Sequence, residues 1–172
     1  VSYTKDINGA HVQNWGLRNP TETLNAPGDN RPVYADADKG NNAYVFTNSN
    51  KGRIWNYTIK AQKTFGKGFY TSLAYNHLDS KDVNSIEAEI TGDAFDFNQV
   101  SGNSNDAVLS ASKYGDKHRF IGVASKKFTY ANDKWSTTLS TFFEYAQGGR
   151  FSYTYAGNIN NDSSGLNNDL LY

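Results

Sequence analysis

The sequence predicts an all-β chain of antiparallel strands, arranged as part of a transmembrane β-barrel. Three observations indicate this fold class. Aromatic residues make up 15% of the 172 residues, and with the abundant Asn, Gly, Asp and Ser they suit pleated strands joined by turns. Bulky and polar side chains alternate along the strand-like segments, and very short turns alternate with very long loops. Membrane barrels combine these features, because one face of each strand meets lipid and the other meets an aqueous lumen.

The first 42 residues are mostly polar. A short strand-like segment at residues 1–5 is followed by proline and glycine breakers up to residue 42, and such breakers are typical of loops. We therefore expect a long extracellular loop over about residues 7–42. The N-terminus has neither the basic start nor the apolar run of a signal peptide. We expect that an export signal has been removed or that the chain begins inside a longer protein.

The first predicted hairpin covers residues 43–79. Its first strand extends to residue 65, with a bulge or a close backbone approach expected at Gly52. A three-residue turn at residues 66–68 joins it to the second strand. One face of the first strand is apolar, with Trp55, Tyr57, Ile59, Ala61 and Phe65, and is interrupted by Arg53 at one end and Lys63 near the other. The opposite face is polar, with Asn56, Thr58, Lys60 and Gln62. Averaging over both faces explains a mean hydropathy of −0.71.

The second predicted hairpin repeats this design over residues 117–146. Its turn is at residues 131–134, and aromatic residues stand at both ends of the apolar row in its second strand. Aromatic bands at both interfaces are typical of membrane barrels, and the strands exceed the roughly 9–11 residues that cross the hydrocarbon core. The polar residues Ser136, Thr138 and Ser140 stand on the opposite face. The sequence thus predicts periplasmic turns at residues 66–68 and 131–134.

Two more loops and a last strand complete the expected chain. Residues 80–116 hold seven acidic residues and two lysines with little regular period, which predicts a long extracellular loop with one short strand. The aromatic segment before residue 156 predicts a further strand, and about residues 156–169 predict a third long loop. The total is about five to seven strands, fewer than a large barrel contains.

Charge and composition exclude several functional classes. Lys+Arg and Asp+Glu both number 17, so there is no electrostatic case for a nucleic-acid partner. Cysteine is absent, which removes disulfide frameworks and thiolate chemistry. The three histidines are isolated, and no serine lies in a nucleophile-elbow context. We therefore expect a protein that is not an enzyme and that has no cofactor, apart from a candidate calcium ion.

The candidate calcium loop lies near the C-terminus. Asn158, Asn160 and Asp162 stand at alternate positions in GNINNDSSGLNND, and alternating oxygen ligands are the pattern of a Ca²⁺ loop. Ser163 occupies the sixth position, where such a loop has glycine, and no glutamate closes the loop. An Asx-rich turn is therefore the alternative interpretation.

The candidate substrate contacts precede this loop. They are Arg150, Tyr153 and Tyr155, at the predicted outer rim of the barrel. Aromatic residues also form the structural girdles of membrane barrels. A purely structural role is therefore the alternative for both tyrosines.

Four segments, taken in order, resemble a known family. They are YVFTNSNKG, KHRFIGVASKKF, FFEYAQGGRFSYTY and GNINNDSSGLNNDLLY. Together they resemble the barrel portion of Oar-like TonB-dependent outer-membrane receptors of Bacteroidota, a group related to SusC-type transporters. The likeness covers most of residues 1–6 and 43–172. The chain departs from the family pattern where GGRFSYTY lacks the usual proline and where Ser163, not glycine, follows Asp162.

The resemblance implies that residues 1–172 form one segment of a roughly 22-stranded barrel in the bacterial outer membrane. Such a barrel is closed by a plug and driven by TonB, and it takes up a ligand. The implied partners are membrane lipid, the TonB complex, whose binding box is not in this chain, and envelope proteins. The residues leave two alternatives open: a small complete outer-membrane barrel of structural or adhesin type, and a soluble glycan-binding β-sandwich.

Overall fold

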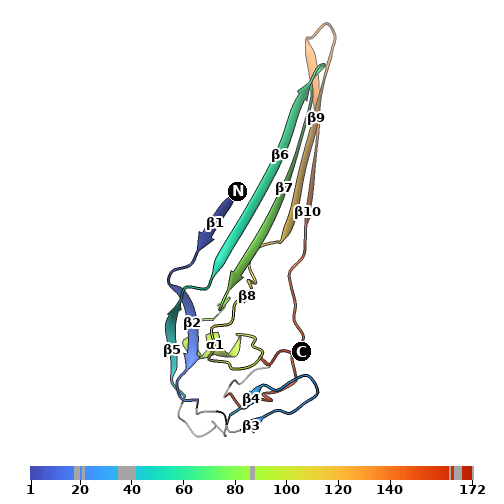
Figure 1. Cartoon of the computed structure of the whole chain (residues 1–172). Helices are drawn as coiled ribbons and strands as arrows, with labels where there is room; N and C mark the ends of the chain where they lie inside the picture. Colours follow the sequence, from blue (N-terminus) through green and yellow to red (C-terminus); the bar gives the residue numbers. More distant parts are fainter. Residues whose placement is uncertain are drawn as a thin grey trace. The chain divides into compact units, whose positions relative to one another are not determined.

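The computed structural model describes residues 1–17, 20, 22–34, 42–85, 88–162, 164 and 168–171. The described residues are mostly β-strand, the sheets are antiparallel, and there is one short helix among them (Figure 1). The chain divides into two compact units. Unit 1 comprises Val1–Thr4, Ile54–Ser80 and Tyr114–Gly149, and unit 2 comprises Lys5–Arg53, Lys81–Lys113 and Arg150–Tyr172. The predicted all-β antiparallel class is confirmed.

Four long strands form the sheet of unit 1, and they run side by side in Figure 1. They are β6 (Arg53–Phe65), β7 (Phe69–Asp82), β9 (His118–Tyr130) and β10 (Trp135–Ala146). The short strand β1 (Ser2–Lys5) pairs with β6, so the strand order is β1-β6-β7-β9-β10. In the described residues the two edge strands, β1 and β10, do not pair with each other. The five strands therefore form an open sheet and not a closed barrel.

Tight turns connect the long strands, at residues 66–68 between β6 and β7 and at residues 131–134 between β9 and β10. In the first turn Lys67 and Gly68 have positive φ angles of 61° and 71°. In the second, Ala131, Asn132 and Asp133 have φ angles of 55°, 54° and 64°. Glycine and asparagine adopt this left-handed conformation most readily, so the local sequence favours both turns.

Replacing Gly68 by alanine is expected to destabilise the β6–β7 hairpin by about 1–2 kcal/mol, the approximate penalty for a Cβ atom in the left-handed region. That atom would also lie 3.0 Å from the carbonyl oxygen of Lys127. Gly66→Ala is the matched control, because nothing lies within 4 Å of its Cβ position. Urea unfolding should separate the two variants, and equal stabilities would contradict this account of the turn.

Unit 2 combines short strands with one helical turn. Strand β2 (Gly9–Asn14) pairs with β5 (Tyr44–Ser49), and β3 (Glu22–Thr23) pairs with β4 (Pro32–Val33). The two-residue strand β8 (Ser110–Ala111) pairs with the last two residues of β7. The helix α1 is Thr91–Asp96.

The hydrophobic core of the described residues lies in unit 2. Val12 of β2 packs with Ala94 and Phe95 of α1, and Tyr44 contacts this cluster with its ring centroid 5.4 Å from that of Phe95. Every buried hydrophobic residue among those described belongs to unit 2. The long strands of unit 1 are therefore held by backbone pairing, without a core of their own.

Three details differ from the prediction. The segment 7–42 is not an irregular loop, since it contains β2, β3 and β4, and the segment 80–116 contains α1 as well as the short strand β8. The pairing of β2 with β5 and of β8 with β7 joins residues far apart in the sequence, which local patterns do not reveal. The strand predicted before residue 156 is absent; Thr154 forms only an isolated bridge to Leu170.

The segment 43–65 also divides into two strands at Gly52. Strand β5 ends at Ser49 and β6 begins at Arg53, and the two have different partners. The close backbone approach expected at Gly52 is confirmed, because the amide of Asp6 donates to the Gly52 carbonyl at 2.9 Å. A Cβ atom at position 52 would collide with the Asp6 carboxylate.

Candidate functional site

The strand register gathers apolar side chains on one face of the unit 1 sheet. Leu73 of β7 lies opposite Gly122 of β9, which lies opposite Phe143 of β10. Strand β6 joins the same face, since the ring centroids of Tyr57 and His77 are 6.0 Å apart. We call this surface the apolar face: it comprises the odd-numbered residues of 55–65, 69–77 and 135–145 and the even-numbered residues of 118–130.

Two aromatic bands cross the apolar face. The band near the turns contains Phe65, Phe69, Phe128, Tyr130 and Trp135, and the opposite band contains Trp55, Tyr57, Tyr75, Phe120 and Tyr145. The bands are six residues apart on β7 and eight to ten apart on β6, β9 and β10, which is about 20–33 Å along the strand. With a tilt of 35–45° the largest of these separations corresponds to about 25 Å, the height of the apolar band in membrane barrels.

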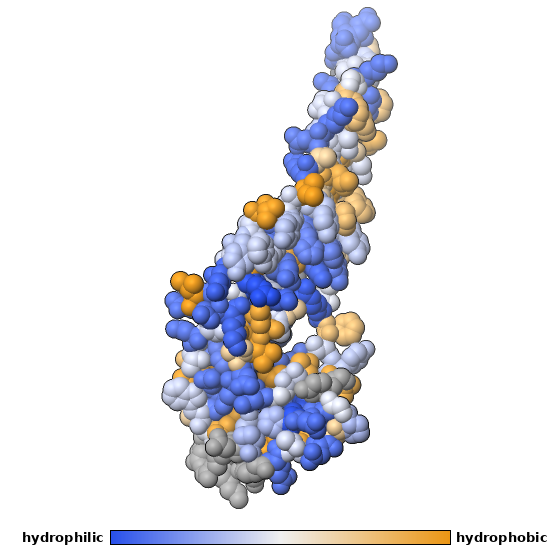
Figure 2. All heavy atoms as spheres, in the orientation of Figure 1, coloured by the Kyte–Doolittle hydropathy of each residue, from blue (hydrophilic) through white to orange (hydrophobic). Residues whose placement is uncertain are grey.

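The middle of the apolar face is largely uncharged and open. Ile59, Leu73 and Leu139 are 71%, 54% and 68% exposed. Lys63 stands near the first turn, with its ammonium 5.0 Å from the Phe65 ring centroid. Lys126 lies opposite Leu139, and its ammonium donates to the Lys67 carbonyl of that turn and lies 5.8 Å from the Phe128 ring centroid. Figure 2 shows apolar residues along one side of the long strands. Lysines at such positions can extend their ammonium groups toward an aqueous interface.

The opposite face of the same sheet is mostly polar, although Val123 of β9 and Phe142 of β10 also lie on it. The Asn76 amide donates to Asn56 Oδ1 at 2.6 Å and to Thr58 Oγ1 at 2.9 Å. Arg119 and Glu144 form an exposed ion pair between β9 and β10, with Nε 2.7 Å from Oε1. Hydrogen-bonding and charged groups thus project mainly from one face, whereas the other is mainly apolar.

The three candidate substrate residues lie in unit 2 and have separate contacts. Arg150 Nη1 donates to the Ser112 carbonyl at 3.0 Å. Tyr153 is 72% exposed, and its ring makes an edge contact with Phe151. The Arg31 guanidinium lies 5.5 Å from the Tyr155 ring centroid. These contacts do not gather the three into one pocket, and their role in substrate binding stays a prediction.

The residues of the candidate calcium loop do come together. Asn160 and Asp162 are fully buried, whereas Asn158 is half-buried. The Asp162 backbone amide donates to Asn158 Oδ1 at 3.2 Å and to Asn160 Oδ1 at 3.1 Å. The sixth loop position, Ser163, lies outside the described residues. The alternation seen in the sequence therefore corresponds to one compact turn.

A buried ion cluster, which we did not predict, lies beside this loop. Arg31 Nη2 is 2.8 Å from Asp29 Oδ2, and Arg31 Nη1 is 2.8 Å from Asp169 Oδ1. Asp169 Oδ2 also accepts the Ile159 amide at 2.9 Å. No short-range pattern marks the Arg31–Asp169 pair, because 138 positions separate the two residues. Asp29 and Pro32 are turn-forming residues on either side of Arg31. The local sequence would therefore have indicated a loop at this position, but not an ion pair.

Burial and charge shift the two carboxyl groups in opposite directions. Burial alone raises the pKa of Asp29, but the hydrogen bonds and charge of Arg31 outweigh it, so the pKa is lowered from its ordinary value. Burial raises the pKa of Asp169, and the hydrogen bonds from Ile159 and Arg31 only partly oppose it. The negative charge of Asp162 adds to that rise.

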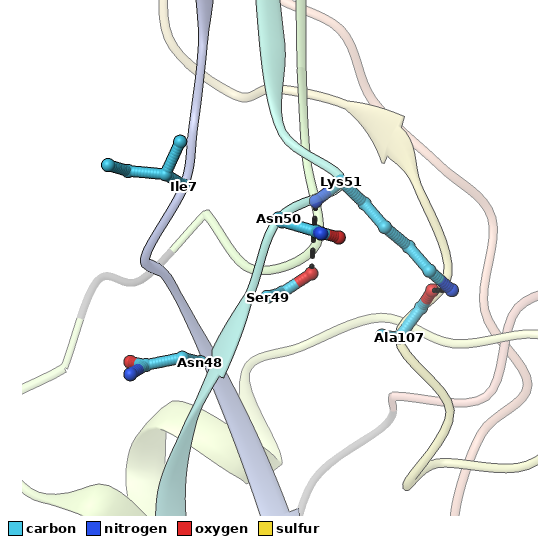
Figure 3. Close-up of a pocket in the computed structure, with 6 residues that line it drawn as sticks. All are labelled: Ile7, Asn48, Ser49, Asn50, Lys51 and Ala107. Atoms are coloured by element: carbon cyan, nitrogen blue, oxygen red, sulfur yellow. Dashed lines mark hydrogen bonds between the residues drawn. The ribbon is translucent and has the colours of Figure 1, made fainter.

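One open pocket of about 370 Å³ lies in unit 2 (Figure 3). Its lining is Ile7, Asn48, Ser49, Asn50, Lys51 and Ala107. The Lys51 side chain extends toward Ala107 and donates to its carbonyl at 2.6 Å. The pocket offers a polar rim but no cluster of catalytic side chains among the described residues, so we assign no chemistry to it.

Within the described ranges, no group of three or more His, Cys, Asp or Glu side chains is arranged to hold a metal ion. The same residues include no helix that is long and apolar enough to cross a membrane. No family model, curated protein or solved structure matches the chain.

Proposed function

We propose that unit 1 is a lipid-facing section of an outer-membrane β-barrel and that the chain serves a TonB-dependent receptor, a transport protein and not an enzyme. The observation that carries this proposal is the apolar face, which lies between two aromatic bands and is covered by no other layer of unit 1. Large exposed apolar patches are rare on soluble monomers and mark contact with a membrane or another protein.

The strand lengths and band spacing favour lipid as the covering layer. The four long strands have 12 to 14 residues each, against a usual length of about 5–6 in globular proteins. A soluble β-sandwich would pack a second sheet on the apolar face, whereas the described residues of unit 1 contain a single sheet. The alternative of a glycan-binding sandwich is therefore less well supported.

The open edges of the sheet favour a section of a larger barrel. Inside lipid, unpaired backbone groups cannot be satisfied by water, so membrane sheets close on themselves. Among the described strands, β1 and β10 each pair with a neighbour on one side only. In the proposed barrel each of these edges pairs with a further strand.

The receptor role rests on the four sequence segments that resemble Oar-like receptors. The polar face, with Asn56, Thr58 and Asn76 joined by hydrogen bonds, would line the lumen, and the loops of unit 2 would lie on the ligand side. Ligand-dependent capture of the periplasmic domain of TonB by the full-length protein tests this role. Capture that is independent of ligand, or no capture, would argue for a structural or adhesin barrel instead.

The membrane part of the proposal can be tested by single-cysteine labelling, because the chain has no cysteine of its own. The full-length protein with Leu139→Cys or Ser140→Cys would be reconstituted in phospholipid vesicles and labelled with an environment-sensitive fluorophore. We expect the label at position 139 to report an apolar environment and to be quenched by brominated lipid, since period-two alternation places only that side chain toward lipid.

The Ser140→Cys variant is the matched control, because the neighbouring residue points to the opposite face. Its label should be quenched by aqueous iodide and not by brominated lipid. Equal quenching of both labels by iodide would contradict membrane insertion. Protection of Leu139→Cys from both quenchers would indicate a protein partner on the apolar face in place of lipid.

A further inference from the structure

A buried polar cluster surrounds the Asp162 side chain in unit 2. Asp162 Oδ2 accepts hydrogen bonds from the Ser104 hydroxyl and from Asn168 Nδ2, the latter at 3.2 Å, and Asp162 Oδ1 accepts the Ser164 amide at 3.0 Å. Asp162 and Asn160 are 0% exposed, and Asn168 is 1% exposed. Carboxylate, amide and hydroxyl oxygens therefore meet in a space from which water is excluded.

The charge of this cluster is not balanced by the described residues. Asp29, Asp162 and Asp169 are all buried, and Arg31 is the cation that pairs with Asp29 and Asp169. Within the described part of the chain, no Lys, Arg or His forms an ion pair with Asp162. Neutral donors alone compensate poorly for a fully buried charge, so the cluster favours an additional cation.

An unpaired oxygen lies at the same place. Asn168 Oδ1 is buried and has no hydrogen-bond partner among the described residues, which is rare because buried polar atoms are nearly always paired. Its amide nitrogen lies 3.2 Å from Asp162 Oδ2. Rotating the amide by half a turn exchanges its nitrogen and oxygen, which brings the unpaired oxygen beside the carboxylate. Two such oxygens repel each other unless a cation lies between them.

We propose that this cluster binds one calcium ion. The Asp162 carboxylate and Asn168 Oδ1 are the central ligands, and Asn158, Asn160 and Ser104 supply further oxygens from the surrounding turn. Oxygens about 3 Å apart can share an ion at the Ca–O distance of about 2.3–2.6 Å. Asp169 stands at the twelfth position counted from Asn158, which is a ligand position in calcium loops. Because Asp169 is paired with Arg31, its role here is to hold the loop in place and not to bind the ion.

The ligand set selects the type of ion and its affinity. All ligands are oxygens, which suits a hard cation, and the irregular turn suits the flexible coordination of Ca²⁺ better than the strict octahedron of Mg²⁺. Only one carboxylate, that of Asp162, is not shared with Arg31. We therefore expect weak binding, with a Kd of about 10⁻⁴–10⁻³ M, the range of extracellular calcium modules.

Calcium titration of the whole chain in detergent tests the proposal. Calorimetry should give one saturable Ca²⁺ event, and saturating Ca²⁺ should raise the melting temperature of unit 2 by several degrees. Equal concentrations of Mg²⁺ should do neither. Asp162→Asn should abolish both effects, whereas Asp106→Asn, which removes an exposed carboxylate of the same unit, should leave both intact. Absence of binding up to 10 times the upper expected Kd, about 10⁻² M, would overturn the proposal.

A second variant keeps the test decisive if Asp162→Asn does not fold. Asn168→Asp places a second carboxylate beside Asp162 and is expected to tighten Ca²⁺ binding at least tenfold, because affinity rises with ligand charge. Its stability should then depend strongly on calcium. If Asn168 is only a hydrogen-bond donor to Asp162, the variant should be equally destabilised with and without calcium, and that result would overturn the proposal. Neither outcome depends on membrane insertion of unit 1.

Discussion

Replacing Leu139 by arginine is expected to destabilise the membrane-inserted protein by about 2–4 kcal/mol, the penalty for a cation at the midplane of the lipid-facing surface of a barrel. Leu139 lies on the apolar face of β10 between Trp135 and Tyr145 and is 68% exposed. An arginine there would add a second cation directly opposite Lys126 of β9. Urea unfolding of the full-length protein in phospholipid vesicles measures the effect.

Ser140→Arg is the matched control for this prediction. It introduces the same charge one residue further along β10, on the polar face, where Arg119 and Glu144 already form an ion pair. We expect a change of less than about 1 kcal/mol there, because charged residues are tolerated in an aqueous lumen. If Leu139→Arg and Ser140→Arg have equal effects, the two faces of the sheet are not in different environments, and the barrel proposal is wrong.

Replacing Arg31 by methionine is expected to destabilise unit 2 by about 3–5 kcal/mol, the usual loss when one partner of a buried ion pair is removed. The change leaves the carboxylates of Asp29 and Asp169 buried without their shared cation. It also removes the hydrogen bond from Arg31 Nη2 to the Leu170 carbonyl. Amide hydrogen exchange of residues 22–34 and 153–162 should therefore become much faster.

Arg119→Met serves as the comparison, since its pair with Glu144 is exposed, with 48% and 37% of the two side chains accessible. Exposed pairs contribute about 0–1 kcal/mol, so its exchange rates should change little. The triple variant Arg31→Met with Asp29→Asn and Asp169→Asn should recover part of the lost stability, because it removes the unpaired charges. Unchanged exchange in Arg31→Met would show that the cluster is not a main support of unit 2.

Much of unit 1 could be predicted from the sequence. The hairpin turns and the division of each long strand into an apolar and a polar face follow from period-two alternation, which is a local property. The break between β5 and β6 was signalled only by Gly52. Its consequence, that β5 pairs with β2 while β6 pairs with β7, depends on contacts that the local pattern does not contain.

Unit 2 was predicted poorly for the same reason. Val12 and Phe95 form its core across 83 positions of sequence, and neither stands in a regular apolar pattern. The helix α1 is a single turn whose N-cap residue, Ile90, makes no side-chain capping bond, so the usual start signal of a helix was missing. The polar composition of these segments correctly indicated many turns, but not how the turns pack.

The candidate calcium site shows the same division. The spacing of Asn158, Asn160 and Asp162 was visible in the sequence, whereas the contributions of Ser104 and Asn168 and the anchoring of Asp169 by Arg31 depend on the tertiary structure. The alternation of side chains along a strand is determined by backbone geometry, so the sequence alone specifies the two faces of the unit 1 sheet. Burial, charge balance and unpaired atoms depend on which distant segments meet, and folding decides this through the sum of many weak contacts.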